Sequence, residues 1–288
     1  MKIIDGKTIS KKIINNIQEE VSIKIDTEGK SPSLAIVLVG NDYASETYVS
    51  AKIKTCKKVG IHTQLFRFDS SVKNNDLKAE IKKLNNDSKF NGILVQLPLP
   101  SHIPQREILD LINPLKDVDG LTSLNTGLLA LGTPKFIPAT PQGIQKLLIE
   151  SRIKIEGKHI VICGRSNIVG KPLSNLLSNN EINANATVTL CHSKTENLID
   201  YTRTADILIV AVGSSEFITE SMIKEGSVVI DVGINRIKDN SVEKGYRIVG
   251  DVDFKSVINK VSKITPVPGG VGPMTIAMLL ENVLKSSN

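Results

Sequence analysis

The chain has 288 residues, of which 40% are hydrophobic and 23% charged, a composition typical of a globular protein with room for two domains. The formal net charge of +6 suits an anionic partner, but only 3% of the residues are aromatic and tryptophan is absent, so nucleic-acid bases would find few stacking surfaces. We therefore expect small anionic molecules rather than a nucleic acid as partners.

The first residues, MKIIDGKTIS, lack the apolar core of a secretory signal. No run of about eighteen apolar residues follows, so we expect no membrane segment and a cytoplasmic protein. The three cysteines and four histidines lie outside the spacings of disulfide frameworks and zinc sites. We therefore expect no metal ion and a reducing compartment.

Short apolar runs alternate with longer amphipathic stretches, which predicts an α/β fold. The run at 34–40 is continuous, β-branched and closed by glycine, as expected of a strand that is buried on both faces. In the first half we expect helices at 7–28, 44–59 and 75–84 and strands at 34–40, 62–68 and 92–97. These make two βαβ crossovers, so the sheet is predicted to be parallel and to bind ligands at the carboxyl ends of its strands.

The Gly-, Pro- and Thr-rich segment at 113–142 predicts a crossing between two domains, followed by a helix at 142–150. A Rossmann-type domain is then expected, with strands at 158–164, 186–191, 206–213, 227–233 and 247–249. The segment at 266–273 is too rich in Gly and Pro for a helix or strand; it is either a plain loop or a close approach to a flat ligand. The predicted domains are 1–141 and 142–273, with the last helix, within 274–288, packing back on the first domain.

A glycine-bounded loop after the strand at 158–164 is the strongest nucleotide signal. Ser166 holds the second glycine position of the usual fingerprint and Gly170 comes one residue late, so a tight turn without a ligand stays an alternative. The next strand ends in Cys-His-Ser-Lys at 191–194, without the acid that NAD-binding domains usually place there. Arg165 and Ser193 therefore favour NADP, although Glu196 lies close by.

Polar residues in the first domain form a second candidate site. Tyr48 and Lys52 lie one helical turn apart, although an aromatic packing residue beside a lysine stem would look the same. Gln96 interrupts an apolar strand at its carboxyl end, where it binds either a ligand or a neighbouring loop. Asp117 and Asp119 mark a turn, a metal site or a ligand anchor, with the turn as the default.

Five motifs together resemble the bifunctional methylenetetrahydrofolate dehydrogenase/methenyltetrahydrofolate cyclohydrolase family along essentially the whole chain. They are YVSAK at 48–52, QLPLP at 96–100, KDVDG at 116–120, GRSNIVGKP at 164–172 and PVPGGVGPMT at 266–275. The resemblance implies oxidation of 5,10-methylenetetrahydrofolate by NADP and hydrolysis of the methenyl product to 10-formyltetrahydrofolate, both in one cleft between the domains. It also implies a homodimer and a place in the one-carbon metabolism that supplies purine, methionine and histidine biosynthesis.

The resemblance also assigns roles to residues. Lys52 would transfer the proton in hydrolysis, Gln96 would orient Lys52 and the substrate, Tyr48 would contact the flat folate rings and Asp119 would anchor the pterin. Further substrate contacts are implied for Val95, Leu97, Pro268, Gly269, Gly270 and Thr275. Cofactor contacts are implied for Gly164, Arg165, Ser166, Ser193 and Ile234.

Two other functions remain open on the sequence. A different two-domain NADP-dependent oxidoreductase, acting on a small hydroxy acid or amino acid, would share the fold. A non-catalytic NADP-binding regulator, or a weak nucleic-acid binder that uses the net charge of +6, belongs to another functional class. The first-domain motifs speak against the first alternative, and measured turnover would separate all of them.

Overall fold

The computed structural model describes residues 2–241, 243 and 245–288. Contacts divide these residues into two compact units. The three-stranded unit comprises Lys11–Leu129, Thr133–Ala139 and Ile276–Asn288. The five-stranded unit comprises the residues up to Ser10, Ala130–Gly132 and Thr140–Thr275. The first residues group with the five-stranded unit because Ile3 forms a parallel bridge with Ile264.

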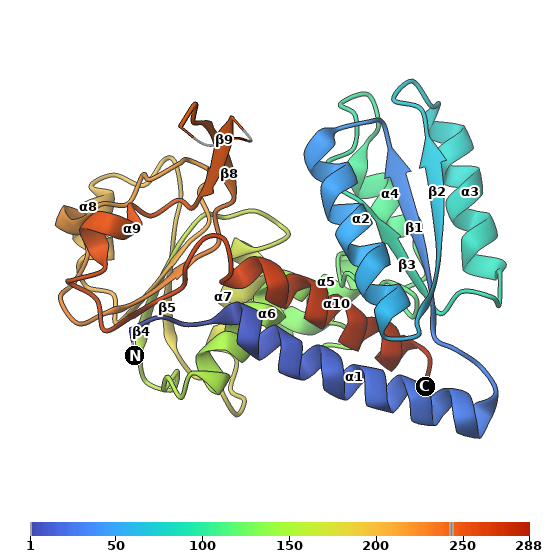
Figure 1. Cartoon of the computed structure of the whole chain (residues 1–288), viewed down its shortest axis with the longest axis horizontal. Helices are drawn as coiled ribbons and strands as arrows, with labels where there is room; N and C mark the ends of the chain where they lie inside the picture. Colours follow the sequence, from blue (N-terminus) through green and yellow to red (C-terminus); the bar gives the residue numbers. More distant parts are fainter. Residues whose placement is uncertain (1, 242, 244) are drawn as a thin grey trace. The chain divides into compact units, whose positions relative to one another are not determined.

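The three-stranded unit is built on a parallel sheet in the order β2-β1-β3 (Figure 1). Its strands are β1 (Ser33–Val39), β2 (His62–Phe68) and β3 (Gly92–Val95). Its helices are α1 (Gly6–Glu28), α2 (Tyr43–Lys58), α3 (Asn74–Asn86), α4 (Gln105–Leu111), α5 (Ser123–Ala130) and α10 (Val271–Ser286). The first residues of both α1 and α10 are grouped with the five-stranded unit.

Strand β1 is buried on both faces because its side chains alternate between two cores. Leu34, Ile36 and Leu38 pack in one core with side chains of α1, α2 and α10. Ala35 and Val37 pack in the other core with side chains of α3 and α4. In Figure 1 the helices α2 and α3 accordingly lie on opposite faces of this sheet. A continuous apolar run predicted this arrangement, because a strand with a solvent face would alternate apolar and polar residues.

The five-stranded unit contains a second parallel sheet, in the order β10-β7-β6-β4-β5. Its strands are β4 (His159–Cys163), β5 (Thr187–Cys191), β6 (Ile207–Val210), β7 (Val228–Asp231) and β10 (Lys263–Ile264). Its helices are α6 (Ala139–Glu150), α7 (Gly170–Ser178), α8 (Leu198–Thr202) and α9 (Phe254–Val257), with a 3-10 turn at Glu220–Met222. Strands β8 (Asn235–Lys238) and β9 (Tyr246–Val249) form a separate antiparallel pair.

The predicted α/β class, with one parallel sheet in each half, is confirmed, but four local predictions differ from the structure. The strand at 247–249 lies in the antiparallel pair rather than in the Rossmann sheet, and the edge strand β10 was not predicted. Helix α5 falls within the segment expected to be only a crossing. Helix α10 begins at Val271, inside the segment expected to be neither helix nor strand. Its Pro273 sits in the first turn, where a helix makes no use of the missing N–H. Among the described helices, none is both long and apolar enough to cross a membrane.

Candidate functional site

Lys52 lies on the buried face of helix α2. The buried positions of this helix are Ser45, Val49, Lys52 and Cys56, which follow the helical repeat and so face the sheet together. Lys52 is only 9% exposed, and such burial of a lysine requires a polar partner. Tyr48, one turn earlier, keeps 36% of its surface exposed, so its ring is accessible to a ligand.

Gln96 supplies that partner. It follows β3 directly, and its backbone N–H donates to the carbonyl of Val37 at 2.8 Å. Its side-chain Oε1 accepts a hydrogen bond from Lys52 Nζ at 2.9 Å, and its Nε2 donates to the carbonyl of Leu97 at 2.7 Å. Both ends of the amide are therefore occupied, and the orientation of the Gln96 side chain is fixed. The bond to Leu97 is the loop contact that the sequence left open, and the bond to Lys52 joins two of the predicted site residues.

Asp119 interacts electrostatically with Lys52. Burial lowers the pKa of Lys52, and the nearby charge of Asp119 partly opposes that effect. Burial also raises the pKa of Asp119, an effect that the charge of Lys52 opposes and that of Asp117 reinforces. Each group therefore favours the charged form of the other, while the surrounding protein disfavours both charges. Lys52 can lose its proton at a lower pH than an exposed lysine does.

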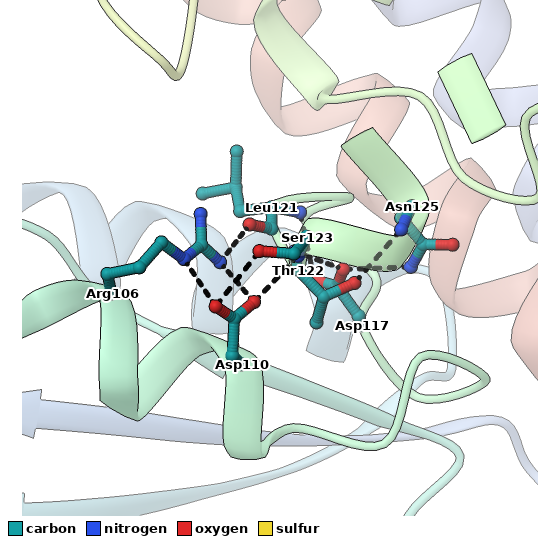
Figure 2. A network of polar contacts seen from close by, with 7 residues as sticks. All are labelled: Arg106, Asp110, Asp117, Leu121, Thr122, Ser123 and Asn125. Carbon is teal, nitrogen blue, oxygen red and sulfur yellow. Dashed lines mark hydrogen bonds and ion pairs between the residues drawn. The ribbon is translucent and has the colours of Figure 1, made fainter. Parts of the chain in front are cut away.

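Asp117 has a different role, which Figure 2 shows. It is 1% exposed, and its carboxylate accepts the backbone N–H of Leu121 at 3.1 Å and of Thr122 at 2.8 Å. It also accepts a hydrogen bond from Asn125 Nδ2 at 2.8 Å. Leu121 and Thr122 directly precede α5, so the carboxylate fixes the turn that leads into this helix. The default interpretation of the aspartate pair as a turn therefore holds for Asp117.

Two further contacts hold the segment that carries Asp119. Arg106 donates to the carbonyl of Leu121 at 2.6 Å and forms an ion pair with Asp110 (Figure 2). Asn282 in helix α10 donates to the carbonyl of Val118 at 2.8 Å. The backbone is thus fixed on both sides of Asp119. Arg106 and Asn282 were not predicted from the sequence; the one signal in it was the amide of Asn282 within the apolar stretch of α10.

The nucleotide loop of the five-stranded unit is shaped by two close backbone approaches. Gly164 has φ +126°, and a side chain on it would overlap the carbonyl of Ala211. A side chain on Gly170 would overlap the carbonyl of Gly164 itself. Ser166, in the second glycine position, accepts the backbone N–H of Val169 at 3.1 Å through its hydroxyl. The loop therefore makes a tight turn into α7 despite its departure from the usual glycine spacing.

A cavity of about 390 Å³ opens at the carboxyl ends of β4, β5 and β6. Gly164, Arg165 and Ser193 line it, as the cofactor interpretation requires, whereas Ser166 and Ile234 are outside its lining. None of the described lining residues is acidic. The other lining residues, which were not predicted, include His192, Leu198, Val212, Ser214 and Phe217. Of these, His192 follows β5 directly and Val212 lies two residues after β6, whereas Leu198 begins α8.

The remaining predicted substrate contacts are distributed over both units. Val95 is 2% exposed and its side chain packs in a core, so only its backbone is open to a ligand. Leu97 is half-buried. Gly269 has φ +114° and its carbonyl accepts the N–H of Lys7 at 3.0 Å. A side chain on Gly270 would overlap its neighbours. Pro268 is exposed, and the Thr275 hydroxyl lies 3.0 Å from that of Thr140.

No group of three or more His, Cys, Asp or Glu side chains suited to a metal ion occurs among residues 2–241, 243 and 245–288. The three cysteines are free and buried.

Comparison with known proteins places these features in context. Residues 4–119 match the tetrahydrofolate dehydrogenase/cyclohydrolase catalytic domain, and residues 138–288 match the NAD(P)-binding domain of the same family. The bifunctional protein FolD of Flavobacterium johnsoniae is 51% identical over 284 residues, which cover 99% of this chain and 96% of that relative.

Two solved structures are also similar over their whole lengths. The bifunctional FolD enzyme methylenetetrahydrofolate dehydrogenase/cyclohydrolase of Campylobacter jejuni has a TM-score of 0.92 and 49% identity, covering 100% of this chain and 98% of that one. The Trypanosoma brucei N5,N10-methylenetetrahydrofolate dehydrogenase-cyclohydrolase, solved with NADP cofactor and an inhibitor, has a TM-score of 0.93 and 37% identity. The similarity covers 99% of this chain and 96% of the Trypanosoma brucei chain.

Proposed function

This chain belongs to the tetrahydrofolate dehydrogenase/cyclohydrolase family, and we propose that its three-stranded unit carries the folate chemistry while its five-stranded unit holds NADP. It is a bifunctional enzyme that oxidises 5,10-methylenetetrahydrofolate with NADP and hydrolyses the methenyl product to 10-formyltetrahydrofolate. The resemblance drawn from the five motifs is thereby confirmed. The alternative of an oxidoreductase for a small hydroxy acid or amino acid finds no support, because residues 4–119 match the folate catalytic domain.

Lys52 is the proposed proton carrier in hydrolysis. The methenyl carbon is electrophilic, and the water that attacks it must lose a proton, which the neutral Lys52 amine accepts. As the bond from this carbon to the ring nitrogen N5 breaks, the Lys52 ammonium returns a proton to that nitrogen. The hydroxyl left on the carbon releases its remaining proton to water as the formyl C=O forms, and the formyl group stays on N10. The observation that carries this proposal is the 2.9 Å bond from Lys52 Nζ to Gln96 Oε1 in a buried setting.

Gln96 suits this proton cycle because its amide is uncharged. Its Oε1 accepts an N–H from Lys52 whether the amine is charged or neutral, so the amine keeps its position through the cycle. A carboxylate in the same place would hold the ammonium form and oppose the loss of its proton.

Asp119 and Tyr48 are the proposed folate-binding residues. The Asp119 carboxylate can accept two parallel N–H donors from the aminopyrimidinone edge of the pterin. The exposed Tyr48 ring can lie against the flat ring systems of the substrate. Burial raises the pKa of Tyr48, so its hydroxyl remains protonated and can donate a hydrogen bond. We also retain Val95, Leu97, Pro268, Gly269, Gly270 and Thr275 as proposed substrate contacts.

The five-stranded unit fits a dinucleotide. The close approaches at Gly164 and Gly170 bring the backbone near a pyrophosphate, and the adjoining cavity has no acid that would repel a 2′-phosphate. Arg165 and Ser193 are the proposed 2′-phosphate ligands, and Ser166 and Ile234 are proposed as further contacts. When bound, NADP supplies the acceptor for the hydride that leaves the substrate.

We further propose a homodimer that works in the cytoplasm. Strand β5 is an edge of the five-stranded sheet, and its Val188, Thr189 and Leu190 are partly exposed. Such an edge has unpaired backbone groups that a second copy can cover. Light scattering of the purified protein tests this assembly; a monomer at micromolar concentration contradicts it.

The function as a whole is tested with purified protein, NADP and 5,10-methylenetetrahydrofolate, following reduced cofactor and 10-formyltetrahydrofolate together. Both products are expected to appear above the spontaneous rate. Reduction of NADP with a small hydroxy acid, and none with the folate, would contradict the proposal.

A further inference from the structure

Asp251 is a buried carboxylate that holds two loops of the five-stranded unit. It is 0% exposed, and its Oδ2 accepts the backbone N–H of Val212 at 2.7 Å and of Gly213 at 2.9 Å. Its Oδ1 accepts a hydrogen bond from Asn235 Nδ2 at 2.8 Å. The first two donors follow β6, and the third belongs to the first residue of β8. One side chain therefore fixes the loop after β6 relative to the loop after β7.

A second carboxylate places Asp251 itself. Asp231 ends β7, and its Oδ1 accepts the backbone N–H of Asp251 at 2.9 Å and of Gly233 at 3.0 Å. Its Oδ2 accepts the N–H of Val252 at 3.0 Å. A side chain on Gly233 would overlap the Asp251 carboxylate, and one on Gly250 would overlap that of Asp231. Both glycines therefore leave room for the carboxylates beneath the loops.

The two loops lie where the sheet would receive half of a dinucleotide. In the order β10-β7-β6-β4-β5 the direction of connection reverses between β4 and β6, and dinucleotides cross a parallel sheet at such a point. Arg165 and Ser193 follow β4 and β5, so the adenosine half belongs on that side and the nicotinamide half over β6 and β7. Val212 already lines the 390 Å³ cavity, and Ile234, in the loop after β7, is 47% exposed.

We propose that Asp251 is a positioning residue for the nicotinamide half of NADP, holding the loops after β6 and β7 in the arrangement that receives it. The inference rests on the NADP-dependent oxidation stated under the proposed function. Asp251 has no exposed surface, so it acts through Val212, Gly213 and Asn235 rather than by touching the cofactor. Recognition of the 2′-phosphate at the opposite half does not depend on it.

Two variants and a matched control separate this role from general stability. Asp251→Asn replaces one acceptor oxygen by an N–H₂ group, which then faces other N–H donors. Asn235→Ala removes a half-buried side chain and its two hydrogen bonds, to Asp251 Oδ1 at 2.8 Å and to the carbonyl of Gly250 at 3.2 Å, and the fold is expected to tolerate this loss. Asp253→Asn is the control, because Asp253 lies two residues further on and its side chain accepts the N–H of Ser256, capping α9.

Three measurements are compared with the wild type: calorimetric titration with NADP alone, amide hydrogen exchange at 211–217 and 232–235 without cofactor, and both enzyme activities. Asp251→Asn is expected to weaken NADP binding about tenfold, the scale of one or two lost hydrogen bonds, and Asn235→Ala about threefold. Exchange in both loops should accelerate and dehydrogenase kcat should fall. The preference for NADP over NAD and the cyclohydrolase rate should stay within about twofold of wild type, as should all values for Asp253→Asn.

The inference fails if Asn235→Ala binds NADP and exchanges its amides as the wild type does, or if Asp253→Asn shows the same losses. Should Asp251→Asn not fold, Asn235→Ala decides alone, and a parallel loss of both activities in that variant also overturns the inference. A wild-type protein that does not reduce NADP contradicts the proposed function instead, so the two failures are distinguishable.

Discussion

Lys52 and Gln96, 44 residues apart in the chain, are joined by a 2.9 Å hydrogen bond from the lysine Nζ to the amide Oε1. The bond connects the buried face of α2 to the residue that follows β3. A neutral partner in a buried setting leaves the lysine free to change its protonation state without losing its position.

Changing Gln96 to Glu should shift the pH dependence of hydrolysis. Burial lowers the pKa of Lys52, so the cyclohydrolase rate should rise with pH and level off below the pH at which an exposed lysine titrates. The added carboxylate favours the ammonium form, so in Gln96→Glu the rise should move to higher pH. Gln64→Glu is the control, because Gln64 is exposed on β2. A profile that stays in place in Gln96→Glu would remove Lys52 from the titration.

Changing Asp119 to Asn should impair both activities. Its proposed partner, the pterin edge, is common to the two reactions, and the amide offers one acceptor where the carboxylate offers two. Folate affinity should fall by roughly tenfold or more, the scale of a lost charge-assisted contact. Equilibrium titration with the folate substrate, beside both rates, checks this expectation. Normal affinity and normal rates would leave Asp119 without a role in binding.

Changing Asp117 to Asn should act mainly on stability. The variant disturbs the hydrogen bonds of a buried carboxylate to the backbone N–H groups of Leu121 and Thr122, and hydrogen bonds to a charged group typically contribute about 1.5 to 3 kcal/mol to the unfolding free energy. Chemical denaturation of Asp117→Asn and Asp119→Asn side by side measures the difference. Equal unfolding free energies for Asp117→Asn and wild type would mean that the network in Figure 2 does not hold this segment.

Changing Arg165 to Ala should weaken NADP more than NAD, because only NADP carries the additional phosphate. The wild type should prefer NADP strongly, and a charge-assisted contact of about 1.5 to 3 kcal/mol corresponds to a loss of roughly 10- to 150-fold. The ratio of kcat/KM for the two cofactors reports this directly. A uniform loss for both would place Arg165 at the pyrophosphate, and equal efficiencies in the wild type would contradict the NADP preference.

The sequence predicted the strands of both sheets except β10, because most of these strands are apolar runs that leave few alternatives. It did not predict α5, β8 or the pairing of β9 with β8, since these short segments lie among turn-forming residues or expose half their side chains. The carboxyl-end rule for parallel sheets predicted that Gln96 lies near a ligand. It could not identify Arg106, Asn282 or Asp251 as supports, because each binds backbone groups that only the folded chain brings close.

Changing Lys52 to Met tests whether Lys52 carries the proton in hydrolysis, because methionine keeps an unbranched stem but has no amine that could take up or release a proton. Hydrolysis is measured with methenyltetrahydrofolate and hydride transfer with methylenetetrahydrofolate, each corrected for the spontaneous reaction. Lys54→Met, at an exposed position of the same helix, serves as the control. We expect a loss of about 10² to 10⁴ in the cyclohydrolase rate, with dehydrogenase activity partly retained. Retained hydrolysis, or a parallel loss of both activities in a folded variant, would contradict this expectation.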